Sequence, residues 1–524
     1  MTAPHAQWQR LDPKSILTGG SLIAAPAVPA LLIMVFSGAS ARSLLITGGI
    51  WVGIALLSYL DAVARWYFTR YHAGEHRFEL RSGRISRSHR SIPRDRIRSV
   101  DLTATVVHRI FGLATVRIGT GRQGGSGEEL QLDSIDRASA ERLRVQLLRG
   151  GDAVGAAVDA EGAGTRASGN DAEAEAAPAQ GAVELARLKP VWLAYGALTF
   201  SLVAVVWGAL GSAFSSLQEL LDSTGVTGGA VAEFGSVPLW LAVAVVAVLF
   251  LLVGALGAVL LSVEMWWGFR LTREHDSALR VRRGLFTVRS ISLEERRLRG
   301  VELSEPLLLR WVGAARTNAV ATGLGTDADG KQPDSKALLP PAPRSEAQRV
   351  AGAVLRAPDP VSSTMLRGHP RAALRRRLNR AALVVVLVIA ATAALTTAGS
   401  PSWTVWTSAL VAAAFGGVLA VDSYRNLGHA LDDRFLVTRC GSLLRRTVSL
   451  RRDGIIGWRV RQSVFQRFAG VITVSATTAA GSQAYSVRDV DASDGLVLAE
   501  RAVPGLLSPC LEEVTQQQDD LRNS

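Results

Sequence analysis

Long uncharged, apolar stretches alternate with polar segments along this chain, and the stretches come in three pairs. Each stretch has roughly the 20 residues that a helix needs to cross a hydrocarbon core of about 30 Å. The pattern therefore predicts six membrane-spanning helices arranged as three hairpins, at 16–60, 190–263 and 381–421. The individual stretches are 16–36, 43–60, 190–213, 238–263, 381–398 and 402–421.

A short signature recurs three times in the polar segments, once after each pair of apolar stretches. An Arg-x-Gly triplet is followed 29 residues later by a second glycine, and another arginine stands three residues before that glycine. A fixed internal spacing indicates one folding unit that is used repeatedly. The signature residues are Arg81, Gly83, Arg109 and Gly112; Arg282, Gly284, Arg310 and Gly313; and Arg439, Gly441, Arg467 and Gly470.

Each polar unit shows strand-like alternation followed by a helical pattern. Phe78 and Leu80 alternate with polar residues before the first triplet, as do Leu279 and Val281 before the second. Several short antiparallel strands closed by one C-terminal helix form the expected α+β unit, because a helix packed over one end covers sheet that would otherwise be exposed. The predicted domains are 65–150, 266–357 and 424–508, with C-terminal helices at 135–149, 344–356 and 491–503 and helix caps at Asp136, Ser345 and Ser493.

Two segments interrupt this regular plan. Residues 151–182 are rich in alanine, glycine and acidic residues, so they bury too little apolar surface to order themselves, and we expect a disordered acidic linker. Residues 324–344 are polar and punctuated by proline inside the second unit, which indicates an enlarged loop.

Composition and charge agree with a membrane protein and set its orientation. Of 524 residues, 48% are hydrophobic and 20% charged, and the mean hydropathy is +0.21. The predicted outer loops 37–42, 214–237 and 399–401 contain one basic residue, Arg42, whereas the polar units are dense with arginine. Because basic residues resist transfer across the membrane, both termini and all three domains are expected in the cytoplasm. The net charge of +13 fits this bias and attraction to anionic headgroups, and no nucleic-acid partner is expected.

The paired helices and the signature together resemble a known family. The third unit carries the likeness best, in His429-Ala-Leu-Asp-Asp-Arg-Phe-Leu-Val-Thr-Arg439-Cys-Gly441 and in Gln466-Arg467-Phe-Ala-Gly470-Val-Ile-Thr-Val474. These segments are similar to YdbS/YdbT-type bacterial membrane proteins with bacterial pleckstrin-homology-like (PH-like) domains. The resemblance implies a multi-pass protein of the bacterial cell membrane, a bent antiparallel sheet capped by a C-terminal helix in each domain, and no known catalytic residue set. The second domain departs from the pattern after Gly313 and is expected to be degenerate, which puts any binding role for it in doubt.

The signature residues allow two interpretations. The repeated arginines are able to bind a headgroup or an acidic peptide by bidentate contacts. Alternatively they end strands and hold turns through carbonyl and carboxylate contacts. Since they recur even in the second unit, the structural interpretation is favoured, and the glycines are expected to fix turns.

Three carboxylates, Asp61, Glu264 and Asp422, stand where the second helix of each hairpin is expected to leave the membrane. A carboxylate at a helix C-terminus opposes the helix dipole and therefore calls for a partner. Arg65 and Arg425 are close enough in sequence to pair locally with Asp61 and Asp422. Interfacial anchoring is the expected role, with coupling between membrane and domain as the alternative.

No motif in the sequence indicates catalysis, a cofactor or a metal. The segments Gly119–Gly124 and Gly325–Lys331 look like phosphate loops, but neither lies between a strand and a helix start, so we interpret them as hairpin turns. Cys440 and Cys510 belong to no metal-ligand pattern. The six apolar stretches contain no ionisable residue, whereas transporters normally place such residues at mid-membrane depth.

The sequence therefore favours a non-enzymatic integral membrane scaffold that presents three cytoplasmic PH-like domains to protein, peptide or lipid partners. The expected partners are the lipid bilayer and either another membrane or cytoplasmic protein or a second copy of the chain. The alternative is a membrane component of small-molecule export or of envelope and antimicrobial defence.

Overall fold

A computed structural model describes most of the chain, in two compact units that meet in sequence between Arg297 and Leu298. This boundary falls inside the second predicted domain, 266–357. The residues described are 8–18, 40–74, 76–83, 88–94, 97, 99–119, 130–148, 182–199, 202–208, 211, 238–274, 278–322, 336–357, 366–397 and 403–510. Residues 151–181 of the predicted linker, 324–335 of the predicted loop and both phosphate-loop look-alikes beyond Gly119 lie outside them. The prediction of a loop over 324–344 is wrong for its second half, because Ala337–Pro343 is a strand.

Four helices in the described part of the chain are long and apolar enough to cross a membrane. A fifth candidate, within the predicted span 190–213, is not one continuous helix: Pro190–Leu198 (η4) is a 3₁₀ helix, and it meets the helix Leu202–Gly208 at a bend of 66°. Of the first predicted span, 16–36, residues 19–36 lie outside the described residues. The four helices are α3 (Ala41–Phe68), α8 (Leu239–Trp266), α11 (Arg371–Thr397) and α12 (Trp403–Arg425).

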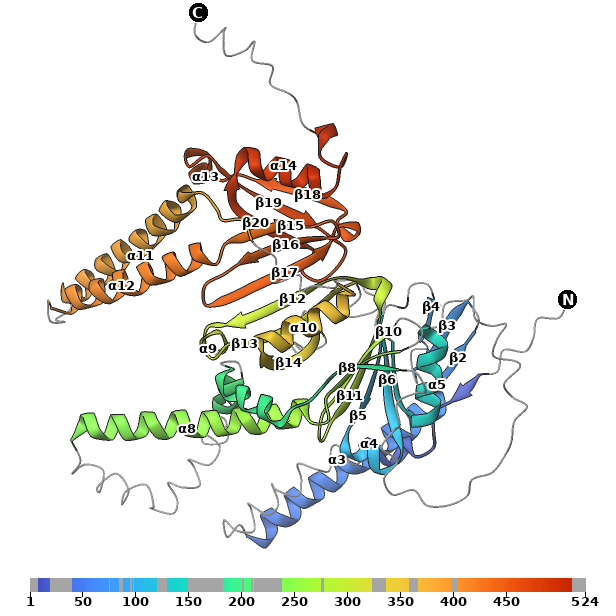
Figure 1. Ribbon diagram of the computed structural model, residues 1–524. Helices are drawn as coiled ribbons and strands as arrows, with labels where there is room; N and C mark the ends of the chain where they lie inside the picture. The colour runs from blue at the N-terminus through green and yellow to red at the C-terminus, as the bar shows by residue number, and fades with distance from the viewer. Residues whose placement is uncertain are drawn as a thin grey trace, which may run out of the picture. The chain divides into compact units, whose positions relative to one another are not determined.

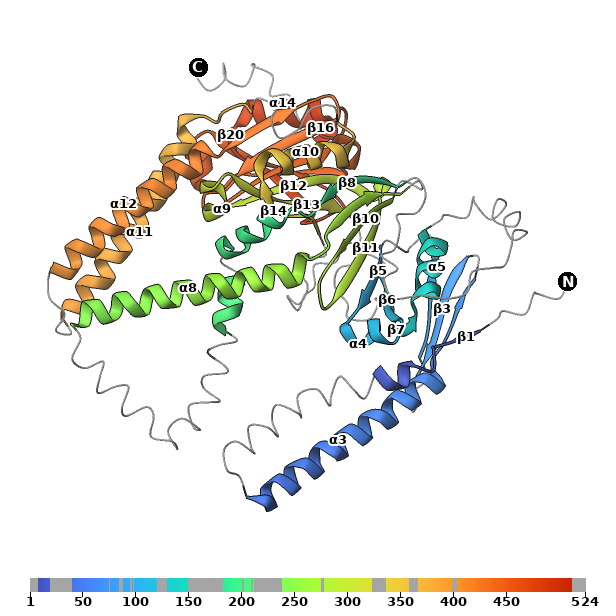
Figure 2. The same cartoon turned by 60° about the horizontal axis from the view of Figure 1, so that its bottom comes forward.

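The first repeat contains strands of two antiparallel sheets, one short helix and one closing helix. The strands alternate between buried and exposed residues, so Phe78 and Leu80 of one sheet and Val116 and Ile118 of the other enter one core. The helix α5 adds Leu143 to that core and closes one end of it (Figure 2). The elements are β2 (Arg70–Ala73), β3 (Arg77–Ser82), β4 (Ser88–Pro93), β5 (Ser99–Ala104), α4 (Val106–Ile110), β6 (Leu113–Gly119), β7 (Leu130–Asp136) and α5 (Arg137–Leu148).

Repeats 2 and 3 use the same order of elements. Repeat 2 contains β9 (Arg270–Arg273), β10 (Ala278–Arg283), β11 (Val288–Glu294), β12 (Leu298–Pro306), α9 (Leu307–Trp311), β13 (Ala314–Ala321), β14 (Ala337–Pro343) and α10 (Arg344–Leu355). Repeat 3 contains β15 (Gly428–Leu431), β16 (Phe435–Cys440), β17 (Leu444–Arg451), β18 (Gly457–Arg461), α13 (Val464–Phe468), β19 (Val471–Thr477), β20 (Ala484–Asp491) and α14 (Ala492–Ala502). All three predicted C-terminal helices are present within two residues of their predicted bounds.

The repeats do not form separate sheets, because neighbouring repeats share them (Figure 1). One sheet has the order β7-β6-β5-β11-β10-β9-β8, and another has the order β14-β13-β12-β17-β16-β15. We call the pairing of β5 with β11 joint 1 and the pairing of β12 with β17 joint 2. Joint 1 pairs Ala104 with Val288, and joint 2 pairs Glu305 with Arg445, which are equivalent positions counted from the signature glycines. The two joints therefore have the same register.

A strand that precedes each hairpin pairs with the strand that follows it, which the sequence pattern did not indicate. In repeat 1, β1 (Gln9–Arg10) pairs with β2, and in repeat 2, β8 (Val183–Arg187) pairs with β9. In repeat 3 the same place is taken by a single bridge between Arg367 and His429. The chain thus leaves and re-enters the same sheet on either side of each hairpin.

Two of the three predicted helix caps are wrong. Asp136 accepts a hydrogen bond from the Ser139 amide at 3.1 Å, as predicted. Helix α14 is capped by Asp491, whose carboxylate accepts from the Ser493 amide at 3.1 Å, so Ser493 is the second residue of the helix. Helix α10 follows Pro343 without a side-chain cap, because the proline side chain has no oxygen to accept from the first amides of the helix, and Ser345 is the second residue of the helix.

Candidate functional site at the membrane-proximal junctions

All six signature glycines have a backbone conformation that favours glycine. The first glycine of each repeat has φ between 106° and 115°, and the second has φ between 65° and 70°. At Gly284 and Gly441 an added Cβ would lie 2.0 Å from a backbone carbonyl oxygen, whereas at Gly112, Gly313 and Gly470 it would meet no atom within 4 Å. The first glycine is therefore required by both conformation and space, and the second by conformation alone.

The second arginine of repeats 1 and 2 holds a turn of the following repeat. Arg109 Nη1 donates to the Leu285 carbonyl oxygen at 2.8 Å, and Arg310 Nη1 donates to the Ser442 carbonyl oxygen at 3.4 Å. Leu285 and Ser442 each follow the glycine of an Arg-x-Gly triplet directly, so the two contacts are equivalent. The contact is of the predicted kind, but it joins two repeats instead of bracing one. Within the described residues, the Arg467 side chain makes no such contact.

The first arginine of each repeat has a different environment in repeat 1 from that in repeats 2 and 3. Arg81 lies over the Trp8 ring, with its guanidinium carbon 4.1 Å from the ring centroid. Burial lowers the pKa of the Arg282 guanidinium, and nearby Arg137 adds to the effect. Burial and Arg445 act in the same way to lower the pKa of Arg439. Arg282 and Arg439 thus stand beside other arginines.

The three predicted carboxylates have three different sets of partners. Asp61 pairs with Arg65 at 2.9 Å, as expected from their spacing. Glu264, in the last turn of α8, accepts from the Thr287 amide at 3.3 Å. Arg425, the expected local partner of Asp422, is not its partner.

Asp422 instead connects three parts of the compact unit that begins at Leu298. Its carboxylate accepts from Arg310 Nη2 of repeat 2 at 2.9 Å and from the Ser442 hydroxyl of repeat 3 at 2.9 Å. Asp422 itself lies in the last turn of α12. One side chain therefore connects the apolar helix α12, the turn of its own repeat and the preceding repeat, because the Arg310 guanidinium reaches across joint 2.

A second polar link, missed from the sequence, connects repeat 3 to the start of α11. Gln466 Nε2 donates to Asp489 Oδ1 at 2.9 Å, and Arg376 contacts the same oxygen. Arg377 Nη1 lies 2.8 Å from Asp489 Oδ2. Asp489 is buried and has a φ of +57°. Nothing in a single sequence marks these residues as neighbours, since they belong to three different elements.

Repeat 1 has a neutral version of this link. His108 replaces Gln466, and its Nε2 lies 3.1 Å from the hydroxyl of Ser134, which has a φ of +58° like its counterpart Asp489. The Ser134 hydroxyl is also 3.1 Å from that of Thr18. Burial lowers the pKa of His108, so the ring is neutral at physiological pH. Repeat 2 has Leu309 and Pro341 at these positions and so lacks the link.

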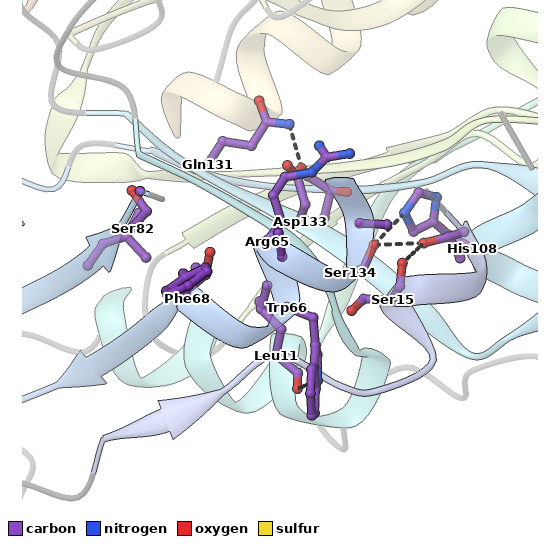
Figure 3. Close-up of a pocket in the computed structure, with 17 residues that line it drawn as sticks. Leu11, Ser15, Arg65, Trp66, Phe68, Ser82, His108, Gln131, Asp133 and Ser134 are labelled. Atoms are coloured by element: carbon purple, nitrogen blue, oxygen red, sulfur yellow. Dashed lines mark hydrogen bonds between the residues drawn. The ribbon is translucent and has the colours of Figure 1, made fainter. Parts of the chain in front are cut away.

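These residues border a cavity of about 580 Å³ in repeat 1 (Figure 3). Its wall includes Arg65 and Trp66 from the end of α3, and Asp133, whose carboxylate accepts from Gln131 Nε2 at 2.6 Å. A serine and a histidine in contact are a common nucleophile and base pair. Here the contact recurs as Gln466 with Asp489 in repeat 3, which favours a structural role for it.

Buried ion pairs across joint 1 were also missed. Arg144 of α5, with 3% of its side chain exposed, contacts Glu274 of repeat 2 through two hydrogen bonds of 3.0 Å and the Ser292 hydroxyl at 2.9 Å. Arg280 contacts Glu141 of α5 at 2.9 Å. The joint is thus fastened by charged side chains as well as by strand hydrogen bonds.

The described residues contain no group of three or more histidine, cysteine, aspartate or glutamate side chains that could hold a metal ion. Cys440 is a free thiol.

The family of the chain follows from a comparison with protein-family models. The model described as "Bacterial PH domain" matches three times, over residues 23–150, 229–357 and 381–502. The chain belongs to the bacterial PH domain family. Each match includes membrane-helix residues as well as the two sheets and the closing helix, so the helices are part of the repeating unit. No curated protein and no solved structure matches the chain.

The bacterial PH domains of this chain are therefore the three repeats described above, and the internal repeat and PH-like domains predicted from the signature are confirmed. The narrower resemblance to YdbS/YdbT-type proteins stays a prediction. The second domain, expected to be degenerate, matches the family over its whole length and supplies strands to both joints.

Proposed function

We propose that this chain is a non-enzymatic integral membrane scaffold in which three linked bacterial PH domains bind an extended, acidic segment of a partner protein on the cytoplasmic side. The single observation that carries this proposal is the outer edge of β18. The equivalent strands β5 and β12 are each covered by a strand of the next repeat, whereas no described strand covers β18.

The membrane part of the proposal is six spans with both termini in the cytoplasm. Two paired strands of one sheet lie on the same side of a membrane, because their hydrogen bonds cannot be made across it. The pairs β1–β2 and β8–β9 and the Arg367–His429 bridge each enclose one hairpin. Each enclosed segment must therefore cross an even number of times, which supports a partner span for α3 and for α8.

An exposed strand edge offers a row of unpaired backbone groups to an added strand. The chain uses this mode internally at both joints, in one register. The same mode at β18 would place a partner strand where β11 and β17 lie in the joints.

Charge at the edge indicates the kind of strand it binds. Positions Asp101 and Glu302 on the covered strands are acidic, but the equivalent position on β18 is Arg459, and Arg461 follows on the same face. A second copy that docked by β4 in the same register would place its Arg90 opposite Arg459, and like charges directly opposite are destabilising. The edge therefore favours an acidic partner strand over a second copy.

A defined peptide tests this binding mode. The purified full-length chain is titrated with a peptide of alternating valine and glutamate, and the double variant Arg459→Glu/Arg461→Glu is expected to bind it at least roughly tenfold more weakly. Arg501→Glu, an exposed charge reversal on α14, is the matched control and should bind like the unmodified chain. Equal binding by all three proteins contradicts the proposal.

A second experiment cross-links the same three proteins in cells and compares the partners that each one captures. The proposal expects a partner that the double variant loses and Arg501→Glu keeps. Specific solute flux across proteoliposomes containing the chain would instead support the export alternative and overturn the scaffold.

A further inference from the structure

The short helix of each repeat has an apolar side chain that no part of the described chain covers. Ile110, Trp311 and Phe468 stand two residues before the second signature glycine, and their exposed fractions are 73%, 71% and 87%. The residue two positions before the tip is buried in repeats 2 and 3, where it is Leu309 and Gln466, and half-buried in repeat 1, where it is His108. Each short helix therefore packs against its domain on one side and has an apolar tip outside it.

The first two tips are linked to the last turn of a spanning helix. Arg109, next to Ile110, bonds to Leu285, whose own amide bonds to the Glu264 carbonyl oxygen in the last turn of α8 at 2.9 Å. Arg310, next to Trp311, pairs with Asp422 in the last turn of α12 at 2.9 Å.

The third tip is tied to a helix start instead of a helix end. Gln466, in the same short helix as Phe468, reaches the start of α11 through Asp489 and Arg377. The depth of each tip relative to the bilayer is thus set by a side-chain link to a spanning helix.

From this placement we propose that the three short helices are interfacial anchors, with Ile110, Trp311 and Phe468 inserted among the headgroups and upper acyl chains of the membrane. The residue directly before the third tip is the exposed Arg467, which suits the anionic headgroups at the same level. Tryptophan and other aromatic side chains are favoured at this depth. The anchors add to the spanning helices by fixing the tilt of each domain against the membrane surface.

This inference rests on the spanning helices of the proposed function and is independent of its peptide edge. Repeat 3 offers the sharpest test, because α13 has three exposed apolar residues, Val464, Phe465 and Phe468. Asp453 lies at the opposite end of β18, with 62% of its side chain exposed, and so provides a control position in the same domain.

The experiment uses the full-length chain with Cys440→Ser and Cys510→Ser, reconstituted in vesicles of phosphatidylcholine and phosphatidylglycerol. Single cysteines at Phe468→Cys, Asp453→Cys and Leu410→Cys, the last in α12, receive an environment-sensitive fluorophore. Quenching is measured with iodide in the water phase and with nitroxide-labelled lipid.

The expected result is lipid quenching at position 468 and iodide quenching there roughly threefold weaker than at 453, as for an apolar group buried about 5–10 Å into the interface. Position 410 should be quenched by lipid alone. Iodide quenching at 468 equal to that at 453 overturns the proposal.

Two further outcomes also overturn it. A label at 468 that neither quencher reaches is covered by protein, which would make the tip a protein-docking surface. A label at 410 that lipid does not quench shows that α12 is outside the bilayer, and that outcome removes the spanning helices on which the anchor depends.

Discussion

The two joints have the same backbone register and opposite side-chain chemistry. Joint 1 is charged beside the closing helix, where Arg144 meets Glu274, and apolar at the strand end, where Ala104 faces Val288. Joint 2 reverses this arrangement. Its strand end has the pair Glu305 and Arg445, with two hydrogen bonds of 2.7 Å.

The positions of joint 2 that match the charged cluster of joint 1 carry no charge. Gln348 replaces Glu141, and the other three positions are apolar: Ala351 replaces Arg144, Leu431 replaces Glu274 and Val437 replaces Arg280. Since the register survives this exchange, it is set by what the joints share: the signature glycines, the turn they form and the arginine that crosses to that turn. The ion pairs then give each joint a different side-chain complement, so that each edge fits its own partner.

The largest expected effect is loss of the charged end of joint 2. Arg445→Met leaves the Glu305 carboxylate, which is 4% exposed, with only Arg344 at 3.5 Å, and should lower the free energy of local opening of β12 and β17 by about 3–5 kcal/mol. Hydrogen–deuterium exchange of the full chain in nanodiscs measures this opening. The matched variant Val288→Met in joint 1 should change β5 and β11 by less than about 1.5 kcal/mol. Equal effects in the two joints would contradict the comparison.

The next largest effect is the difference in stability between alanine variants of the two signature glycines of repeat 3. Gly441→Ala places a Cβ 2.0 Å from the Leu444 carbonyl oxygen at a φ of 106° and is expected to cost about 3 kcal/mol. Gly470→Ala meets no atom and has a φ of 65°, so its cost should be about 1–2 kcal/mol. Thermal unfolding of the detergent-purified chain, followed by tryptophan fluorescence, measures the stability of both variants. A larger loss of stability in Gly470→Ala than in Gly441→Ala would contradict the roles assigned to the two glycines.

A smaller effect depends on pH. Burial lowers the pKa of His369 from 6.5 to about 3, helped by neighbouring His429 and Arg377. Between these values the unfolded chain binds a proton that the folded chain does not, so stability is full above about pH 6.5 and falls by about 1.4 kcal/mol for each pH unit below it. His369→Leu should flatten this part of the stability profile. An unchanged slope in the variant would remove His369 as its cause.

The smallest expected effect concerns the arginine that crosses each joint. Arg310→Met removes a partly exposed pair with Asp422 and should weaken joint 2 by about 1 kcal/mol. Arg467→Met, at the equivalent position in repeat 3, should leave stability unchanged within about 0.5 kcal/mol. Hydrogen–deuterium exchange of the β17 amides distinguishes the two variants. An equal loss of protection in both variants would contradict the bridging role of Arg310.

The sequence predicted what local pattern determines. The spacing of Gly83 and Gly112 gave the repeat, and apolar periodicity gave the closing helices. Single-sequence patterns did not reveal that β5 pairs with β11, because strand pairing depends on edges that come together only in the fold. The same reason explains why Asp422 was expected to pair with Arg425, three residues away, when its partner is Arg310 from another repeat.

The strands before the hairpins were missed for a different reason. Gln9–Arg10 and Val183–Arg187 are too short to show periodicity, and the Arg367 bridge is a single residue. Their position is fixed by pairing with the strand that follows each hairpin and not by their own sequence.

The most direct test of the joined repeats is disulfide cross-linking in the full chain with Cys440→Ser and Cys510→Ser. Ser304 faces Arg446 in joint 2, and Thr103 faces Arg289 at the equivalent place in joint 1. Directly opposed residues on antiparallel strands lie about 4.5–5.5 Å apart between Cα atoms, within disulfide range. Cysteine pairs at both places should oxidise readily, and the two-residue slip pair Ser304→Cys/Val448→Cys should not. Oxidation of the slip pair, or failure of both in-register pairs, would contradict the shared register.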